Sequence, residues 1–331
     1  MELVCPAGSP AALRAAIEHG ADAVYVGLRD NTNARSFPGL NFSIEQIATA
    51  TRLARDRNVR LFLAVNTYAQ GGRWREWRRA VDLAADVGVS ALIAADMAVL
   101  DYAANHHPSL DRHLSVQGSA TNWRALTLMH DLFGIRRAVL PRVLSMTQVE
   151  RLVEDSPVPL EVFGFGSLCI MVEGRCQLSS YVTGQSPNTH GICSPASFVR
   201  WKETNDGMES RLNDKLIDRF ATGEKAGYPT VCKGRYDVEG KVLHALEEPV
   251  SLNTLNLLGR LYRNGIAAIK LEGRQRSPAY ISQVTGVWRE AIDSVIRDPE
   301  HFVAKASWQA VLAMVSEGAQ TTLGAYSRSW Q

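Results

Sequence analysis

The stretch Arg60-Leu-Phe-Leu-Ala-Val-Asn66 is a short apolar run that ends in a polar residue, and Ala91-Leu-Ile-Ala-Ala-Asp96 repeats this pattern further along the chain. Runs of this length and composition are typical of buried β-strands. Between them, residues 73–87 combine apolar and charged side chains with the spacing of an amphipathic helix. A strand, a helix and a second strand in this order form the unit from which parallel α/β folds are built.

The same unit repeats on both sides of this stretch. Several helix candidates begin after a Ser or Asn that can accept hydrogen bonds from the free N–H groups of the first turn, as at Ser43, Asn122 and Ser145. The eight expected strands are Glu2–Cys5, Ala23–Leu28, Arg60–Asn66, Ala91–Asp96, His113–Gln117, Ala138–Arg142, Leu160–Phe165 and Ala268–Gly273. The expected helices are Ser9–His19, Ser43–Arg57, Arg73–Val87, Met97–His106, Asn122–Phe133, Ser145–Glu154, Ser251–Asn264, Pro278–Arg297 and Ser307–Ser316.

The spacing of these strands predicts one interruption. The first seven start about 20 to 40 residues apart, whereas roughly 100 residues separate the seventh from the eighth. We therefore predict an α/β protein with a (β/α)8 TIM-like barrel formed by residues 1–165 and 249–300. A cysteine-bearing insertion of residues 166–248 follows strand seven, and residues 301–331 form a C-terminal helical tail. A doubly wound open sheet is the alternative, because periodicity does not report whether a sheet closes.

The composition is that of a folded protein with little net charge. Lys and Arg number 36 and Asp and Glu 34, which gives +2 and argues against a dedicated nucleic-acid binder, so no nucleic-acid partner is expected. The first residues lack the basic and apolar regions of a secretory signal, and the apolar stretch of residues 91–100 is interrupted by Asp96. We expect a cytoplasmic protein without a transmembrane segment.

Polar side chains follow most of the expected strands. In a barrel, the carboxyl ends of the strands form the active face, although polar residues there also commonly cap the neighbouring helices. A mixture of Arg with Asn and Gln would suit a small substrate with carboxylates, since guanidinium groups pair with carboxylates in a bidentate manner. The candidates for binding such a dicarboxylate are Arg35, Asn66, Gln117, Arg142 and Arg274.

Four of the five cysteines lie in the insertion, at Cys169, Cys176, Cys193 and Cys232. In a reducing compartment, four thiolates can bind zinc or an iron–sulfur cluster. No pair has the tight spacing that is usual in structural zinc sites, which favours a cluster held by loops, with zinc or unconnected thiols as alternatives. The fifth, Cys5, ends the first expected strand and is expected to pack in the core.

Several segments resemble the collagenase-like "U" peptidase family over the whole chain. The cysteine-bearing segments are the most specific part of this resemblance. The segments are Glu2-Leu-Val-Cys-Pro-Ala-Gly8, Gly166-Ser-Leu-Cys-Ile-Met171, Glu173-Gly-Arg-Cys176, Ser186-Pro-Asn-Thr-His-Gly191, Cys193-Ser-Pro195, Lys270-Leu-Glu-Gly-Arg274 and Thr321-Thr-Leu-Gly-Ala-Tyr326.

The resemblance implies a cofactor and a reaction. It is strongest to members that act in oxygen-independent ubiquinone biosynthesis, and it implies that the four insertion cysteines ligate a 4Fe-4S cluster. It also implies anaerobic hydroxylation of an aromatic ring with prephenate as oxygen donor. The implied partners are a homologous subunit, forming a heterodimer, and a lipid-carrier-like protein that holds the quinone precursor.

Other functions remain open from the sequence, and the catalytic residues are unknown. A peptidase would fit the historical name of the family, but no HExxH, GxSxG or phosphate-binding loop is present. Hydroxylation of an RNA base would share the chemistry and change the substrate. A scaffold without catalytic activity is a further alternative.

Overall fold

The computed structural model describes residues 1–187, 193–224 and 226–328. Its helices are α1 (Pro10–Glu18), α2 (Ile44–Asp56), α3 (Trp74–Asp86), α4 (Met97–His106), α5 (Trp123–Phe133), α6 (Met146–Asp155), α7 (Leu178–Thr183), α9 (Leu258–Arg263), α10 (Pro278–Arg297) and α11 (Ala306–Val315). Its strands are β1 (Glu2–Pro6), β2 (Ala23–Gly27), β3 (Arg60–Val65), β4 (Ala91–Ala94), β5 (Arg112–Leu114), β6 (Arg137–Val139), β7 (Leu160–Ser167), β8 (Val199–Thr204), β9 (Gly207–Leu212), β10 (Lys215–Phe220), β11 (Tyr236–Val238), β12 (Lys241–Leu243), β13 (Ser251–Asn253), β14 (Ala268–Leu271) and β15 (Thr321–Thr322).

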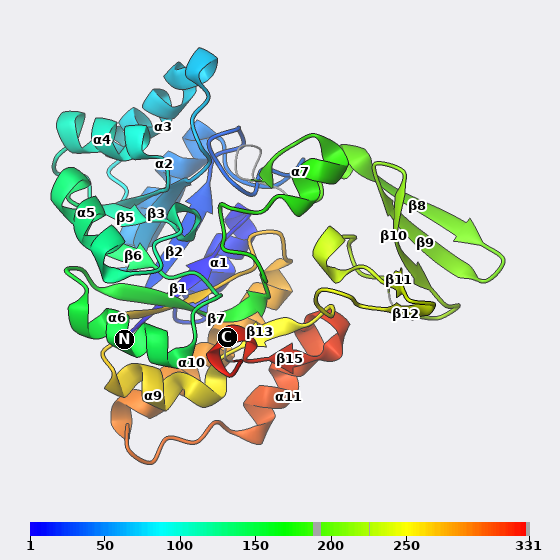
Figure 1. The fold of residues 1–331 in the computed structure, drawn as a ribbon. Coiled ribbons are helices and arrows are strands. Elements are labelled where there is room, and N and C mark those ends of the chain that lie inside the picture. The colour runs from blue at the N-terminus through cyan, green and yellow to red at the C-terminus, as the bar shows by residue number, and fades with distance from the viewer. Residues whose placement is uncertain (188–192, 225, 329–331) are drawn as a thin grey trace.

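Eight parallel strands close into a barrel (Figure 1). Strands β1 to β7 pair in chain order, and β14 pairs with both β1 and β7. The (β/α)8 prediction is confirmed, and closure excludes the open doubly wound sheet. The expected caps are also confirmed, since the side chains of Ser43, Asn122 and Ser145 each accept a backbone N–H at the start of α2, α5 and α6.

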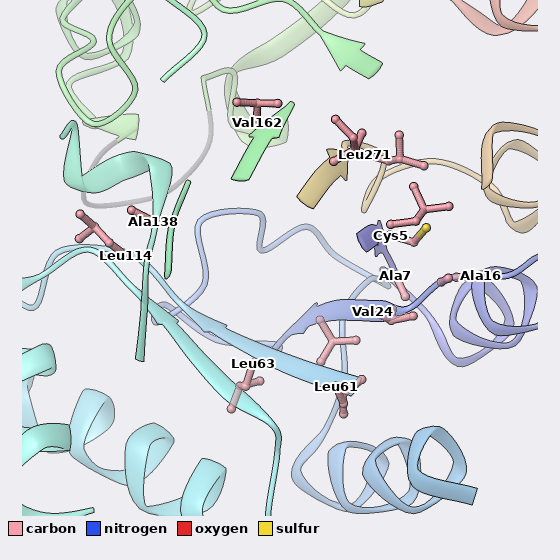
Figure 2. Close-up of a cluster of buried hydrophobic side chains, with 14 of the residues drawn as sticks. Cys5, Ala7, Ala16, Val24, Leu61, Leu63, Leu114, Ala138, Val162 and Leu271 are labelled. Atoms are coloured by element: carbon pink, nitrogen blue, oxygen red, sulfur yellow. The ribbon is translucent and has the colours of Figure 1, made fainter. Parts of the chain in front are cut away.

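Successive side chains along the strands point alternately into two separate cores. On β3, Leu61, Leu63 and Val65 face the surrounding helices and belong to the main apolar cluster, whereas Phe62 and Ala64 belong to a smaller cluster inside the barrel. Figure 2 shows part of the main cluster, with Cys5 among its apolar side chains. Burial raises the pKa of the Cys5 thiol to about 12, and the thiol accepts a hydrogen bond from Thr285 at 3.4 Å. The expected core role of Cys5 is confirmed.

The insertion carries its own secondary structure. It contains α7, an antiparallel sheet of β8, β9 and β10, and the hairpin of β11 and β12. Figure 1 shows the three-stranded sheet extending away from the barrel. Cys169 and Cys176 lie between β7 and α7, whereas Cys193 lies between α7 and β8 and Cys232 between β10 and β11.

One expected helix was wrong at its start. Residues 251–253 form β13, which pairs antiparallel with the end of β7 and parallel with β15 in the chain's last part. Helix α9 begins only at Leu258, after a 3₁₀ turn. An apolar run of this length is compatible with either structure, and the pairing partners decide in favour of a strand. The last part of the chain therefore combines α11 with a short strand.

No helix in the described part of the chain combines the length and apolarity needed to cross a bilayer.

Candidate functional site

The mouth of the barrel contains a buried ionic cluster around Glu272, which follows β14. Arg142, just beyond β6, donates from Nη2 to Glu272 Oε2 at 2.7 Å. Its Nη1 donates to Glu173 Oε1 at 2.5 Å, and Arg35 Nη2 lies 3.8 Å from Glu272 Oε1. Burial alone would raise the pKa of Glu272, but the charges of Arg142 and Arg35 outweigh it, so the pKa is lowered. Glu272 is therefore ionised at neutral pH.

Arg142 lies at the centre of this cluster. Its side chain is only 4% exposed, and its guanidinium carbon lies 3.5 Å from the centroid of the Phe163 ring. Burial opposes the charge of Arg142, but Glu272 and Glu173 overcome this effect and raise its pKa. The guanidinium is thus a permanent cation with both Nη groups bound to carboxylates.

Arg274 is likewise held by the protein. Its Nη1 donates to Asn33 Oδ1 at 2.5 Å, and Asn33 Nδ2 in turn donates to the Leu28 carbonyl. The guanidinium lies 5.5 Å from the centroid of the Tyr25 ring. Burial lowers the pKa of Arg274 to about 10, so the side chain remains charged at neutral pH.

The Asn66 side chain and the Gln117 backbone form hydrogen bonds at the rim. Asn66 Oδ1 accepts a hydrogen bond from the Ala34 N–H at 3.0 Å, which fixes the loop before Arg35. The Gln117 carbonyl accepts from Tyr68 Oη at 2.7 Å. Within the described residues, the buried Gln117 Oε1 has no hydrogen-bond partner, and the same is true of Arg142 Nε and Glu173 Oε2. The mouth therefore offers polar atoms that a ligand or water can satisfy.

The structure brings the five predicted donor-binding residues to one end of the barrel, with different exposures. Arg35 is the most accessible, with a side chain that is 31% exposed. The other four residues are at most 8% exposed. A role of these side chains in binding a donor stays a prediction.

The four insertion cysteines lie within electrostatic reach of one another. All four are free and partly buried. Burial raises the pKa of Cys169, Cys193 and Cys232, that of Cys232 to about 11, and neighbouring thiolates add to each increase. A negative charge on Cys193 raises the pKa of Cys169 and Cys232, and one on Cys176 raises the pKa of Cys193 and Cys232.

Cationic side chains from the mouth reach the same thiols. The charge of Arg142 opposes the increase in the pKa of Cys169, and that of Arg35 does so for Cys193. Lys233 adjoins Cys232 in the chain, and its ammonium donates to Ser167 Oγ at 3.2 Å and pairs with Glu317. The cysteine loops therefore lie beside the mouth.

The donor chemistry of these residues fits an iron–sulfur cluster. Four thiols are its usual ligand set, and a cluster separates its ligands by the width of its inorganic core, whereas zinc gathers them around one atom. In residues 1–187, 193–224 and 226–328, no three His, Cys, Asp or Glu side chains lie close enough together to hold a single metal ion. The donor chemistry of four thiols therefore suits a cluster, and the cluster itself stays a prediction.

Sequence reasoning missed Glu173 and Lys233 as members of this site. Glu173 lies in a loop between two cysteines, and Lys233 follows the last one. Their proximity to cysteines was a possible signal, but nothing in a loop sequence reveals that a charged side chain is buried. Part of the segment Ser186–Gly191, which carried the family resemblance, lies outside the described residues.

A closed α/β barrel with a cysteine-bearing insertion at its mouth defines the class of this protein. The model of peptidase family U32 matches residues 8–328, and the chain belongs to this family.

Three curated relatives illustrate the range of the family. The chain is 28% identical over 313 residues to "tRNA hydroxylation protein P1" of Bacillus subtilis, covering 93% of this chain and 66% of that protein. It is 30% identical to a "Collagenase" of Porphyromonas gingivalis, covering 95% of this chain and 70% of that protein. It is 28% identical to the "23S rRNA 5-hydroxycytidine C2501 synthase" of Escherichia coli, covering 90% of this chain and 40% of that protein. The chain thus spans about two thirds or less of the length of these relatives.

Proposed function

We propose that this chain is the iron–sulfur subunit of an oxygen-independent hydroxylase, with Cys169, Cys176, Cys193 and Cys232 as ligands of a 4Fe-4S cluster. One observation carries the proposal: each of the four insertion thiols interacts electrostatically with at least one other, beside a barrel mouth that contains Arg35 and Arg142. The names of two relatives, which refer to hydroxylation, support the reaction class. When bound, the cluster would supply or relay electrons.

For the substrate, we propose the aromatic ring of a ubiquinone precursor, as in the UbiU proteins that this sequence resembles. Prephenate is the proposed oxygen donor, because its two carboxylates suit a cationic mouth. Arg35 is the best candidate to bind one carboxylate, since its side chain is the most accessible of the three arginines. Gln117 Oε1 and Arg142 Nε would orient the polar groups of the donor or an intervening water.

The proposed assembly contains two further proteins. A homologous UbiV-type subunit would form a heterodimer with this chain, and a lipid-carrier-like protein would present the quinone precursor. The chain's part in this assembly is to hold the donor at the mouth, beside the four thiols. Activity is therefore expected only with the partner subunit present.

The direct experiment is anaerobic reconstitution. The purified chain, its partner subunit and a carrier loaded with the quinone precursor are incubated with prephenate that carries labelled oxygen in its ring hydroxyl. A two-electron acceptor is added, because the ring loses two electrons when it gains a hydroxyl group, and the product is analysed by mass spectrometry. Labelled oxygen in the hydroxylated ring is the expected result. Hydroxylation that proceeds equally without prephenate would contradict the proposed donor.

An RNA-base hydroxylase is the second candidate, because two relatives carry names that refer to tRNA or rRNA hydroxylation. The formal charge of +2 does not favour RNA, since backbone phosphates demand many cationic contacts. Replacing the loaded carrier by total RNA in the same reaction separates the candidates. Labelled nucleosides without any labelled quinone precursor would favour the RNA substrate.

A peptidase is less well supported, although one relative is named a collagenase. Hydrolysis needs an activated nucleophile, such as a serine beside a histidine and a carboxylate. His107 and Asp82 form a histidine–carboxylate pair, but the pair lies between the end of α4 and α3. This is the end of the barrel opposite the mouth, so the pair is not part of the site at the mouth. Cleavage of denatured collagen that survives replacement of all four insertion cysteines would favour the peptidase.

A further inference from the structure

Arg142 connects the cysteine loop with two strand ends. It follows β6, and its two Nη groups reach Glu173 at 2.5 Å and Glu272 at 2.7 Å. Glu272 directly follows β14 in the barrel wall. Glu173 lies between Cys169 and Cys176 in the insertion. One buried side chain thus ties a loop that carries two proposed ligands to the rim of the barrel.

The same loop has two other contacts with the rim. Ser119, which follows β5, donates from Oγ to the Glu173 carbonyl. At Gly174, an added Cβ would lie 2.2 Å from the carbonyl oxygen of Gln117, and φ is +83°. The backbone at residues 173–174 is therefore pressed against the end of β5, while Arg142 holds the Glu173 side chain. These contacts leave the cysteine loop little freedom to leave the mouth.

The contacts that the Arg142 guanidinium already makes suit a role in holding the cysteine loop better than a role in binding the donor. Both Nη groups of Arg142 already face carboxylates, and the Phe163 ring covers one face of the group at 3.5 Å. A donor carboxylate that took either Nη group would have to displace Glu173 or Glu272, leaving a buried carboxyl group without its partner. Only Nε has no partner within the described part of the chain.

We propose that Arg142 is a positioning residue that holds the loop of Cys169 and Cys176 against the barrel mouth, so that the two thiols are set for the cluster. This inference rests on the proposed function, because it takes the four cysteines to be cluster ligands. Arg142 holds the side chain of Glu173, and Glu173 in turn holds the loop that carries Cys169 and Cys176. Residues that orient metal ligands in this way typically change metal affinity by about 10- to 100-fold when replaced.

A matched control lies at the other end of the same strand. Arg137 begins β6, is 8% exposed in its side chain, and pairs with Glu161 at 3.3 Å and Glu2 at 2.8 Å. It is thus a second buried arginine between two carboxylates, at the amino end of the barrel and distant from the mouth. Replacing either arginine removes a buried charge pair, but only Arg142 contacts the cysteine loop.

The test compares Arg142→Gln, Arg142→Lys and Arg137→Gln with the wild-type chain, all purified anaerobically. Iron and sulfide per chain, the spectrum of the reduced cluster, the rate of cluster loss to a chelator, and the melting temperature are measured. We expect Arg142→Gln to lose the cluster at least about tenfold faster than the wild-type chain, and Arg142→Lys to restore part of the cluster retention. Arg137→Gln should retain the cluster nearly as well as the wild-type chain, despite a lower melting temperature. If Arg142→Gln does not fold, Glu173→Gln makes the same test and leaves the contact with Glu272 intact.

The outcomes separate this inference from the function on which it rests. An iron-free wild-type chain would overturn both. A wild-type cluster with equal rates of loss in all variants would overturn only the role of Arg142. Equal acceleration by Arg142→Gln and Arg137→Gln would also overturn it, because the effect would then follow general stability.

Discussion

Lys270 and Glu161 form an ion pair of 2.6 Å inside the closed barrel, where their side chains are 6% and 1% exposed. Burial would raise the pKa of Glu161, but the charges of Lys270 and Arg137 lower it, so the carboxylate is ionised. The barrel interior is therefore partly ionic. Removing one partner of such a pair destabilises the fold, because the other partner is left as a buried charge without compensation.

Replacing one partner should be costly. We expect Lys270→Met to lower the free energy of unfolding by about 3–5 kcal/mol, because Glu161 is left buried with a weaker set of partners. Adding Glu161→Gln should recover part of this loss by removing the uncompensated charge. Denaturant unfolding measures both variants.

An exposed pair serves as the control for this prediction. Arg260 and Glu150 lie 2.6 Å apart, with side chains that are 49% and 24% exposed. Arg260→Met should cost less than about 1 kcal/mol, since solvent screens the pair. Similar costs for Lys270→Met and Arg260→Met would show that the interior pair is not desolvated as described.

His113 should make stability depend on pH. Burial lowers the pKa of His113 to about 3, with Arg137 and Lys270 contributing, although Glu161 opposes the shift. Between this value and the ordinary pKa of about 6.5, the unfolded chain binds a proton that the folded chain excludes. The stability contribution of the neutral ring is therefore complete above pH 6.5 and declines as the pH falls toward 3.

The variant His113→Gln removes this titration. Over the same interval, the wild-type chain should lose up to about 1.4 kcal/mol of additional stability per pH unit relative to the variant. Unfolding of both proteins at several pH values measures the difference. Parallel pH profiles would mean that His113 is not excluded from protonation in the folded state.

Gly174 tests how tightly the cysteine loop is seated. Gly174→Ala places a methyl group 2.2 Å from the Gln117 carbonyl oxygen and also strains a positive φ, so it should displace the loop and reduce the iron content. Gly184 offers a matched control, because its φ is +71° but nothing lies within 4 Å of an added Cβ. Gly184→Ala should cost some stability and retain iron. Equal iron loss in both variants would show that backbone strain alone explains the effect.

The sequence predicted the barrel more completely than the site. Strands such as Arg60–Val65 are visible because alternate side chains face two apolar cores, and this pattern is local. The pairing of β13 with β7 is not local, so the expected helix at residue 251 was wrong.

The position of Arg142 after a strand was predictable, but its partners were not. Glu173 and Glu272 lie 31 and 130 residues further along the chain. No periodicity relates such positions, and a loop glutamate is usually exposed. The ion pairs that assemble the mouth depend on the closed barrel, which brings the strand ends together.

In the proposed function, four insertion cysteines hold one cluster, and the iron and sulfide content of anaerobically purified chains tests this most directly. The Cys5→Ala variant should contain as much iron and as much sulfide as the wild-type protein, because Cys5 is fully buried in the apolar core. Alanine at Cys169, Cys176, Cys193 or Cys232 should each deplete both elements and abolish the visible absorption of the cluster. A colourless wild-type chain without iron, or four alanine variants with undiminished iron, would contradict the account.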